Sequence, residues 1–496
     1  MAAPLRRFER AELKYNGDHI FNHQARMRTK TGTGNIAYRP LSFTLAVAAL
    51  SVFFGLNLGS IFAYKNQLMY VFLLNSYDID SVVSVVLLGA AAGVMCGGFI
   101  SQGSGRKSGI IAGAAIGLAA SCTAILASDF SSLLLSEFTV GAGFGIYIVS
   151  ALLYAAEISL PTSRGMCCCL PAAVACLGFL ASIAARLVVP DSPLLMSICI
   201  ASAGSALCLL CALWLPESPR WLALAGYGDA ALTSLFTLRS SQAAAAREMA
   251  FINDVAGRTE RGMQLYLHSA VSRRALRTLV VLIVLMHLSG FAIVPYMSLE
   301  LIHRYKLQYL GLLVMRNYDY SYGFVKAAVT VAFFGAVTAM MASDRAGRQQ
   351  SMLVGAGISL CMLALLSAVT LFGISDLNVV FVSALILVYI FAAVFTTLTF
   401  LCVFSCEILP SGGREAGLCL ILVIHILCFI AGIQDVGVMS PGFDLSPFFA
   451  ALLCFCALLC FVLAFRVPDL GVGSLERNET RLMEGRLFAP SRQSSS

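Results

Sequence analysis

Long apolar runs separated by short polar connections cover most of the chain. Ten of the twelve longest runs contain no Asp, Glu, Lys or Arg, as expected inside a bilayer, where an unpaired charge is costly. Each run is close to the 20 or so residues that a helix needs to cross a membrane. The runs lie at 41–63, 81–101, 108–128, 131–156, 166–185, 194–215, 278–299, 322–342, 351–375, 378–406, 416–434 and 446–465. The pattern predicts an all-α membrane protein with twelve transmembrane helices.

The runs form two sets of six, separated by a break of 62 residues. The break contains short amphipathic segments, which favour surface helices over a catalytic domain. Both chain ends are polar, and we expect them to lack stable structure. The predicted organisation is a cytosolic tail at 1–40, a six-helix bundle at 41–215, a helical linker at 216–277, a second six-helix bundle at 278–466 and a tail at 467–496.

Lys and Arg are distributed unequally between the two sides of the membrane. The side that carries the tails and the linker has 27 of them, the other side has five, and one lies inside a span. Basic residues accumulate in cytosolic segments, so both termini and the linker are expected in the cytosol. Hydrophobic residues make up 59% of the chain and charged residues 12%, against about 45–50% and about 25% in soluble domains. This composition excludes a water-soluble enzyme.

Polar residues on the cytosolic side recur along the chain. Glu157 and Arg164, after the fourth span, are matched by Glu407 and Arg414 after the tenth, at an offset of 250 residues. Two further correspondences follow the same order and pair Arg106 with Arg348 and Pro216-Glu217 with Pro468-Asp469. Such order indicates a duplicated half. Parallel repeats with a binding site between them occur in a large class of secondary transporters, so two pseudo-symmetric bundles are expected.

Charged residues at the cytosolic helix ends are candidates for a gate. Carboxylates and guanidinium groups form bidentate pairs, which would close this side and separate when it opens. The alternative is that the charges only anchor helix ends at the lipid headgroups. The repeated spacing favours a gate. The gating candidates are Arg106, Lys107, Glu157, Arg164, Glu217, Arg220, Asp344, Arg345, Arg348, Glu407 and Arg414.

Several of these residues lie in longer motifs. They are Gly105-Arg106-Lys107, Tyr154-Ala155-Ala156-Glu157-Ile158-Ser159 with Arg164-Gly165, Pro216-Glu217-Ser218-Pro219-Arg220-Trp221-Leu222, Leu288-Ser289-Gly290, Asp344-Arg345-Ala346-Gly347-Arg348, Glu407 with Arg414, and a weaker Pro468-Asp469-Leu470. With these motifs the chain resembles the major facilitator superfamily and, within it, the sugar porter family, from the first span to about residue 472. The resemblance implies a twelve-helix transporter of hexoses or related small solutes that works by alternating access.

The binding cavity that the resemblance implies departs from the family pattern. Family Gln positions in spans five and seven are Ala172 and Met286-His287, and a family Asn in span seven is Ala292. A Pro-x-Trp expected in span ten is replaced around Leu401-Cys402, and an Asn-Trp pair in span eleven is His425-Ile426. Each lost amide removes hydrogen-bond donors and acceptors for a sugar hydroxyl. The membrane fold is therefore better supported than glucose as the cargo.

A short series of polar residues remains in the predicted spans as candidates for substrate binding. They are Asn57, His287, Ser289, Tyr296 and His425. The resemblance places Asn57 where proton-coupled family members carry Asp, and an amide does not titrate near neutral pH, so Asn57 favours uniport. Each histidine has three interpretations, as a satisfied core residue, a substrate donor or a proton carrier. Core packing is the simpler interpretation of Tyr296.

Two charges lie within spans. Glu137 replaces the basic residue that usually begins a motif of span four, and it is the candidate for a relocated proton site. Lys326 in span eight is interpreted as a side chain that reaches to the external headgroups. The sequence has no His/Cys spacing typical of a metal site, no phosphate-binding glycine loop and no catalytic triad. No cofactor, no metal and no enzymatic activity are expected.

The expected function is that of a facilitative uniporter for a small polar solute, with a hexose or related sugar as the solute. One alternative is a proton-coupled carrier that uses Glu137 or a histidine. A second is a non-transporting nutrient sensor or scaffold derived from a transporter, which the altered cavity motivates. The expected partners are the solute and the lipid bilayer, without nucleic acid. We expect a multi-pass protein of the plasma membrane rather than of an organelle, monomeric as the transport unit.

Overall fold

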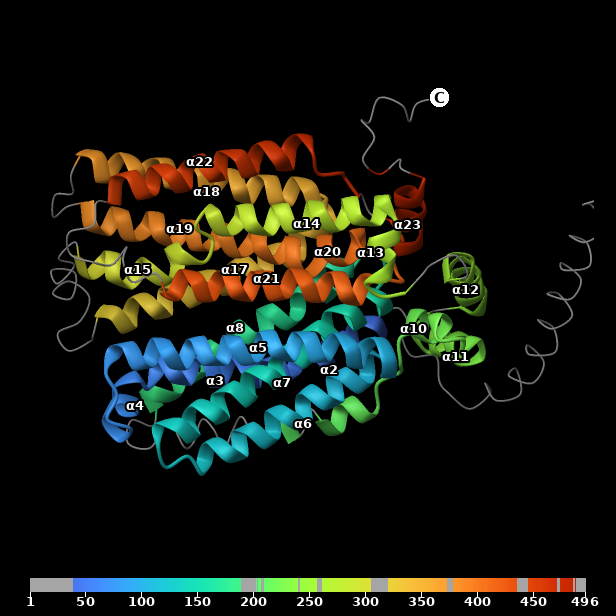
Figure 1. Ribbon diagram of the computed structural model, residues 1–496, viewed down its shortest axis with the longest axis horizontal. Coiled ribbons are helices and arrows are strands. Elements are labelled where there is room, and N and C mark those ends of the chain that lie inside the picture. Colours follow the sequence, from blue (N-terminus) through green and yellow to red (C-terminus); the bar gives the residue numbers. More distant parts are fainter. Residues whose placement is uncertain are drawn as a thin grey trace, which may run out of the picture.

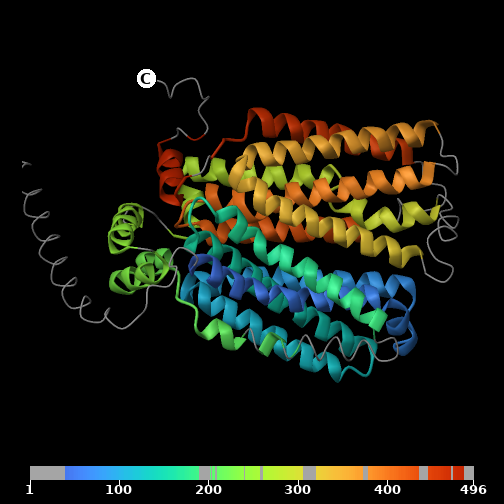
Figure 2. The ribbon, with the colours of Figure 1, turned by 180° about the vertical axis from the view of Figure 1, so that it is seen from behind.

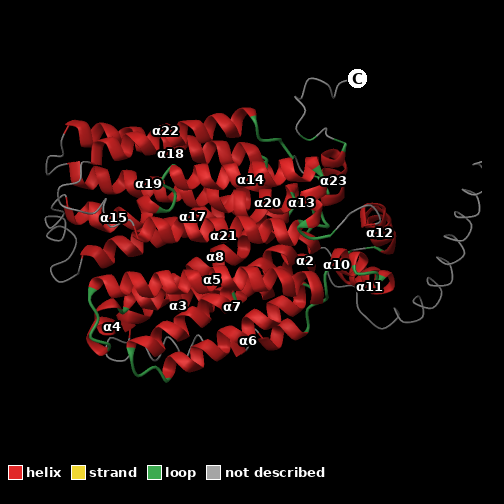
Figure 3. Cartoon of the chain, viewed as in Figure 1, coloured by secondary structure: helices red, strands yellow, loops and turns green. Residues whose placement is uncertain are grey.

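The computed structural model describes residues 39–188, 202, 204–206, 209–239, 241–256, 261–304, 320–372, 378–434, 445–470, 473–484 and 487. Within them the regular structure is helical, without strands (Figure 3). The long helices lie side by side in two bundles, one from each half of the chain (Figure 1), and the view from behind shows the same division (Figure 2). The predicted all-α fold with two bundles is confirmed.

Eleven helices of the described residues are long and apolar enough to cross a membrane. They correspond to eleven of the twelve predicted spans. Half of the sixth predicted span, 194–215, lies outside the described residues, as does most of the tail at 1–40. The domain boundaries stay predictions.

The first bundle begins with one span divided into two helices that meet at Leu50. A short helix, α4, then turns the chain back into the bundle. The elements are α2 (Arg39–Ala49), α3 (Ser51–Ala63), α4 (Lys65–Val71), α5 (Ser76–Ser104), α6 (Arg106–Ile125), α7 (Phe130–Ile158) and α8 (Arg164–Val188).

The second bundle contains two interrupted spans. Gly290, with a φ of +90°, ends α14, and the chain resumes as α15. In the tenth predicted span a π-helical turn separates α19 from α20. The elements are α14 (Ala270–Leu288), α15 (Ile293–Arg304), α17 (Tyr320–Arg345), α18 (Arg348–Phe372), α19 (Asn378–Leu398), η4 (Thr399–Phe404), α20 (Ser405–Ile408), α21 (Arg414–Gln434) and α22 (Leu445–Phe465).

The bundles meet through two related helix pairs, because α5 packs against α21 and α8 packs against α17. Small residues permit the close approach. A Cβ added at Gly98 on α5 would collide with Cys419 Sγ on α21. A Cβ added at Gly165 on α8 would collide with Ser343 Oγ and crowd the Asp344 carboxylate. The repeat found in the sequence is therefore visible in how the halves touch.

One end of the bundles carries short helices, and we call it the linker face. Four of these helices come from the predicted linker and lie beside the bundle ends (Figure 1). The fifth, α23, corrects the expectation that the C-terminal tail lacks structure: it buries Leu475 and Leu482 and carries acids that bind the linker face. We call the opposite end, with α4, the far face. The short helices are α10 (Pro219–Leu224), α11 (Gly228–Leu238), α12 (Gln242–Ala256), α13 (Gln264–His268) and α23 (Leu475–Met483).

Candidate functional site

Charged side chains from both bundles meet at the linker face in two ion-pair clusters. Each cluster holds two arginines and two acids, and their charges balance. The first cluster is Arg106, Glu157, Arg414 and Glu415, and the second cluster is Arg164, Asp344, Arg348 and Glu407. Because each cluster contains members of both bundles, it exists only while the bundles are close together at this face.

Arg106 holds the first cluster together. It begins α6, and its guanidinium donates two hydrogen bonds to the Glu157 carboxylate at 2.7 and 2.8 Å. Glu415, in the first turn of α21 in the other bundle, lies 2.5 Å from the same guanidinium. Arg414, also from α21, lies farther from Glu157, at 3.6 Å. Arg106 and Glu157 are 0% and 1% exposed as side chains, so each charge is neutralised by protein rather than by water.

Glu407 holds the second cluster together. Arg348 begins α18 and donates two hydrogen bonds to Glu407, at 2.8 and 2.9 Å. Arg164 of the first bundle reaches the same carboxylate at 3.0 Å. Asp344 accepts hydrogen bonds from the backbone N–H groups of Gly165 and Met166, at 2.8 and 2.9 Å. A carboxylate at the N-terminus of α8 also interacts favourably with the helix dipole.

Glu217 performs a related task within the first bundle. Its carboxylate accepts hydrogen bonds from the backbone N–H groups of Arg106 and Lys107, at 3.0 and 3.2 Å, at the start of α6. A Cβ added at Gly105, which has a φ of +99°, would collide with this carboxylate. Burial raises the pKa of Glu217 above its usual range, although the backbone donors favour the ionised form. The Gly-Arg-Lys motif therefore depends on the Pro-Glu-Ser-Pro-Arg motif for its geometry.

Arg220 joins three of the short helices. Its guanidinium on α10 lies 2.7 Å from Glu476 on α23 and 3.3 Å from Glu248 on α12. Burial opposes ionisation of Glu476, but the charge of Arg220 outweighs it and lowers the pKa of that carboxyl to about 2. Arg239 completes the group with two bonds to Glu248, at 2.5 and 2.7 Å. The C-terminal helix α23 is thereby attached to the linker helices α10 and α12.

Besides Glu217 and Arg220, two further predicted gating residues lie outside the two ion-pair clusters. Lys107 donates from its ammonium group to the Leu213 carbonyl at 2.7 Å, which anchors a helix end. Arg345 is exposed and has no ion pair among the described residues. For these two side chains the structure agrees better with the anchoring interpretation than with a gate.

The two histidines of the spans lie together in the second bundle, about midway along their spans. His287 Nε2 on α14 and His425 Nδ1 on α21 are 2.9 Å apart, at hydrogen-bonding distance. They border a cavity of about 160 Å³, whose other lining residues are apolar apart from Thr397. Pockets that hold drug-sized ligands are larger, about 300–1,000 Å³. The cavity suits a small solute, and the lining residues are Ile283, Met286, His287, Phe291, Ala393, Val394, Thr397, Leu398, His425 and Phe429.

Three of the five predicted binding residues do not line this cavity. Ser289 is fully buried and donates to the Leu285 carbonyl at 2.7 Å, beside the break between α14 and α15. Tyr296 donates to Asp80 on α5 at 2.5 Å and so bridges the bundles nearer the far face. Asn57 lies in the first bundle, in contact with the Glu137 carboxyl. The structure brings together His287 and His425, and it brings together Asn57 and Glu137, but it keeps these pairs apart.

Several of the contacting acids are not among the residues that the sequence predicts for the site. Glu415 follows the predicted Arg414 directly, and its place in the first turn of a helix is the signal that could have revealed it. Asp80 directly precedes the second predicted span. Glu476 and Glu248 lie on short surface helices, and the pattern of the sequence contains no signal for their shared partner, Arg220.

Two bundles, a cavity and balanced clusters that bridge one face define a secondary transporter. A family model described as sugar (and other) transporter matches residues 42–481. The chain belongs to this family, within the major facilitator superfamily. It is an integral membrane transporter of the sugar transporter type rather than an enzyme, as expected.

Some relatives and solved structures resemble the chain over most of its length, and others over a shorter part. The galactose-proton symporter of Escherichia coli (strain K12) is 26% identical over 452 residues, which cover 90% of this chain and 95% of the relative. A facilitated glucose transporter, member 10 of solute carrier family 2 from Xenopus laevis, is 36% identical over 129 residues, 25% of this chain and 23% of the relative. The proton:xylose symporter XylE bound to 6-bromo-6-deoxy-D-glucose has the same fold, with a TM-score of 0.76, 16% identity and coverage of 90% and 99%.

Proposed function

We propose that this protein carries a hexose or a related small polar solute across a membrane by alternating access. The observation that carries the proposal is the pair of neutral clusters joining the two bundles at the linker face, with a small cavity behind them. Opening the linker face requires Glu415 to leave Arg106 and Arg164 to leave Glu407. The bonds within each bundle, from Arg106 to Glu157 and from Arg348 to Glu407, can persist in both states.

The gating role therefore falls on the cross-bundle contacts. Glu157, Arg164, Arg348, Glu407 and Arg414 belong to the clusters that break and re-form. Asp344 acts with them, because it bonds the first turn of α8 in the other bundle. Glu217 and Arg220 position the elements that carry the clusters. Lys107 and Arg345 are peripheral.

The histidine pair is the proposed recognition element for the solute. In a hydrogen-bonded pair of neutral imidazoles, one outer nitrogen is a donor and the other an acceptor, and exchanging tautomers exchanges these roles. His287 Nδ1 is buried and has no hydrogen-bond partner among the described residues. A hydroxyl group, which donates and accepts, can match either arrangement. Phe291 and Phe429 supply apolar surface for the carbon side of the same solute.

The membrane setting is also a proposal. Because 27 of the basic residues are expected on one side, we place the linker face in the cytosol, with both chain ends, and the far face outside the cell. The plasma membrane is the proposed location, and the monomer is the proposed transport unit.

A carrier of this kind works either as a facilitative uniporter or by coupling solute transport to protons. Asn57, an amide, favours facilitative uniport. Glu137, a buried carboxyl in contact with Asn57, favours coupling to protons, and relatives of both kinds occur: the galactose-proton symporter and the facilitated glucose transporter.

Uptake into proteoliposomes tests the proposed function. Purified protein is reconstituted and offered radiolabelled D-galactose, D-xylose and D-glucose, with counterflow from preloaded vesicles as the readout. We expect counterflow for at least one sugar, and we expect His287→Phe and His425→Phe to reduce it strongly. Arg345→Gln is the control variant and should keep wild-type counterflow. Sugar binding without counterflow would favour the sensor interpretation, and the absence of both would refute a sugar as the solute.

A further inference from the structure

We propose that Glu137 and Asn57 form the proton-binding site of this carrier, a carboxyl and amide pair that is complete only when Glu137 is protonated. The inference rests on the proposed transport function and specifies its energy source. It assigns the ionisable group to α7, whereas Asn57 on α3 supplies the fixed partner.

The two side chains are buried and touch. Glu137 and Asn57 are 6% and 8% exposed, and the Asn57 amide is close enough to interact with the Glu137 carboxyl. Glu137 is seven residues from the start of α7 at Phe130, which is about 10 Å along a helix that rises 1.5 Å per residue. The pair therefore lies in the half of the membrane that adjoins the far face.

Two oxygen atoms of this pair have no partner. Asn57 Oδ1 and Glu137 Oε2 are buried and make no hydrogen bond with the described residues. The amide NH₂ of Asn57 is the only donor group of the pair when Glu137 is ionised. Oδ1 and Oε2 are then both acceptors, and two acceptors cannot satisfy each other. A proton on Oε2 turns that atom into a donor. One proton is therefore what the hydrogen-bonding inventory of the pair requires.

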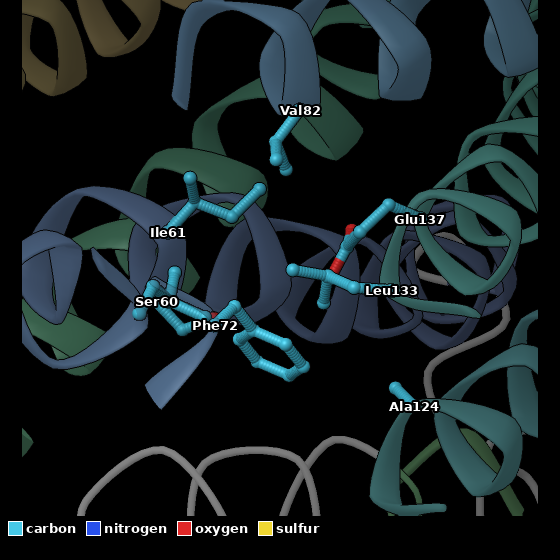
Figure 4. Close-up of a pocket in the computed structure, with 8 residues that line it drawn as sticks. Ser60, Ile61, Phe72, Val82, Ala124, Leu133 and Glu137 are labelled. Carbon is cyan, nitrogen blue, oxygen red and sulfur yellow. The ribbon is translucent and has the colours of Figure 1, made fainter. Parts of the chain in front are cut away.

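The surroundings offer no countercharge to an ionised Glu137. A cavity of about 30 Å³ adjoins the carboxyl (Figure 4). Glu137 is the only charged residue among those that line this cavity. Lys65, which begins α4, is not among the lining residues. Asp80, the nearest acid on α5 to the cavity residue Val82, is bound to Tyr296. The remaining lining residues are Ser60, Ile61, Leu68, Phe72, Val82, Ala124 and Leu133.

A buried carboxylate without a cation is costly, so the closed form of the site holds the neutral acid. The cavity has room for about one or two water molecules by volume. Leu68 of α4 and Phe72, the residue directly after this helix, line the cavity on the side of α4. When the far face opens, water reaches Glu137 and can solvate its ionised carboxylate.

The proton step is a simple transfer. A hydronium ion at the far face gives a proton to Glu137 Oε2, forming one O–H bond and leaving water, and the neutral pair then closes with the solute bound. At the linker face the O–H bond breaks and the proton returns to water. Each cycle moves one proton with the solute, which agrees with the titratable group being single in this cavity.

The test uses the full chain in proteoliposomes, with radiolabelled D-galactose and D-xylose. An inward proton gradient of one pH unit supports accumulation of up to about tenfold for one proton per solute. We expect accumulation by wild type, and none by Glu137→Gln, which should still perform counterflow. The exchange variant Asn57→Asp with Glu137→Asn keeps one carboxyl in the pair and should restore gradient-driven accumulation. Asp129→Asn, an exposed acid at the start of α7, is the matched control and should behave as wild type.

The outcomes separate the two proposals. Counterflow without accumulation in wild type, or accumulation by Glu137→Gln, would overturn the proton site and leave the carrier intact. Absence of counterflow would reject the transport function. If counterflow is absent, infrared spectroscopy of the solute-free protein still tests whether Glu137 is protonated. We expect a protonated carboxyl band that Glu137→Gln removes and Asp129→Asn keeps, and a spectrum unchanged by Glu137→Gln would refute the site.

Discussion

The two ion-pair clusters are related by the repeat but are connected differently. In both, the arginine that begins a helix holds a glutamate of its own bundle by two bonds, Arg106 with Glu157 and Arg348 with Glu407. The contacts across the bundles differ in part. In both clusters a base crosses to the acid, because Arg414 lies 3.6 Å from Glu157 and Arg164 lies 3.0 Å from Glu407. The second acid differs in its partner: Glu415 crosses to an arginine side chain at 2.5 Å, whereas Asp344 crosses to backbone N–H groups at the start of α8.

The position of the fourth charge explains this difference. The offset of 250 residues matches Glu415 with Gly165, and the offset of 242 matches Asp344 with Gln102. One acid has therefore changed place between the repeats, and each cluster still holds two positive and two negative charges. Buried charges must be neutralised together. Charge balance is thus conserved more strictly than the individual pairs.

Removal of the acid at the centre of the second cluster should have the largest effect. Glu407→Gln leaves Arg164 and Arg348 buried with one acid, Asp344, between them, and breaking a buried pair costs about 3–5 kcal/mol. We expect transport to fall more than tenfold and the protein to shift toward a form open at the linker face. Labelling of the buried Cys402 and Cys406 by an impermeant thiol reagent, mapped by mass spectrometry, measures the shift. Arg345→Gln is the control, and labelling no greater than in that control would contradict the gate.

The acid that crosses in the first cluster should matter less. Glu415→Gln removes one charge-assisted contact to Arg106, worth about 1.5–3 kcal/mol, and Glu157 still holds that arginine. We expect the same shift as for Glu407→Gln, but smaller, in the labelling assay. Adding Gln102→Asp supplies an acid at the position that matches Asp344, and partial recovery would show that balance rather than position is required. No recovery would mean that the site of the charge is also fixed.

Asp344→Asn tests the backbone contact that only the second cluster has. The variant keeps one acceptor oxygen for Gly165 or Met166 but loses the charge at the start of α8, for an expected cost of about 1 kcal/mol. Uptake should fall by less than tenfold, with a small gain in thiol labelling. An effect as large as that of Glu407→Gln would show that Asp344 belongs to the centre of the gate.

The attachment of the C-terminal helix should depend on pH only in acid. The folded pKa of Glu476 is about 2, below the value of about 4.3 for a free Glu. A lowered pKa means that ionised Glu476 stabilises the attachment above about pH 4.3, and that this contribution is lost as the pH falls toward 2. Proteolysis within 473–484 should be constant from pH 8 to 5 and increase below that. The Glu476→Gln variant should be cleaved readily at every pH in this range. Equal resistance of wild type and variant to proteolysis at pH 7 would refute the contact.

The sequence predicted the spans, the repeat and seven of the eight cluster residues. Apolar runs and recurring charges are local signals, and they depend on membrane thickness and on gene duplication. The contact between Glu415 and Arg106 joins residues 309 positions apart, and it depends on how the bundles are placed relative to one another. The packing of the bundles also decides that Tyr296 and Ser289, which the sequence places among the binding candidates, do not line the cavity. It likewise decides that α23 is ordered against the linker face.

The π-helical turn η4 has a consequence for how the tenth span transmits change. Such a turn inserts one residue into the helical ladder, which rotates everything beyond it by about 100° about the helix axis. Ala393 and Thr397 at the cavity lie before the turn, and Glu407 lies after it. The cavity residues and the gate residue therefore do not lie on one continuous face of this helix. If the extra residue were lost or moved along the span, Glu407 would rotate away from Arg348 without any change at the cavity. The π-helical turn can therefore uncouple the gate from the cavity.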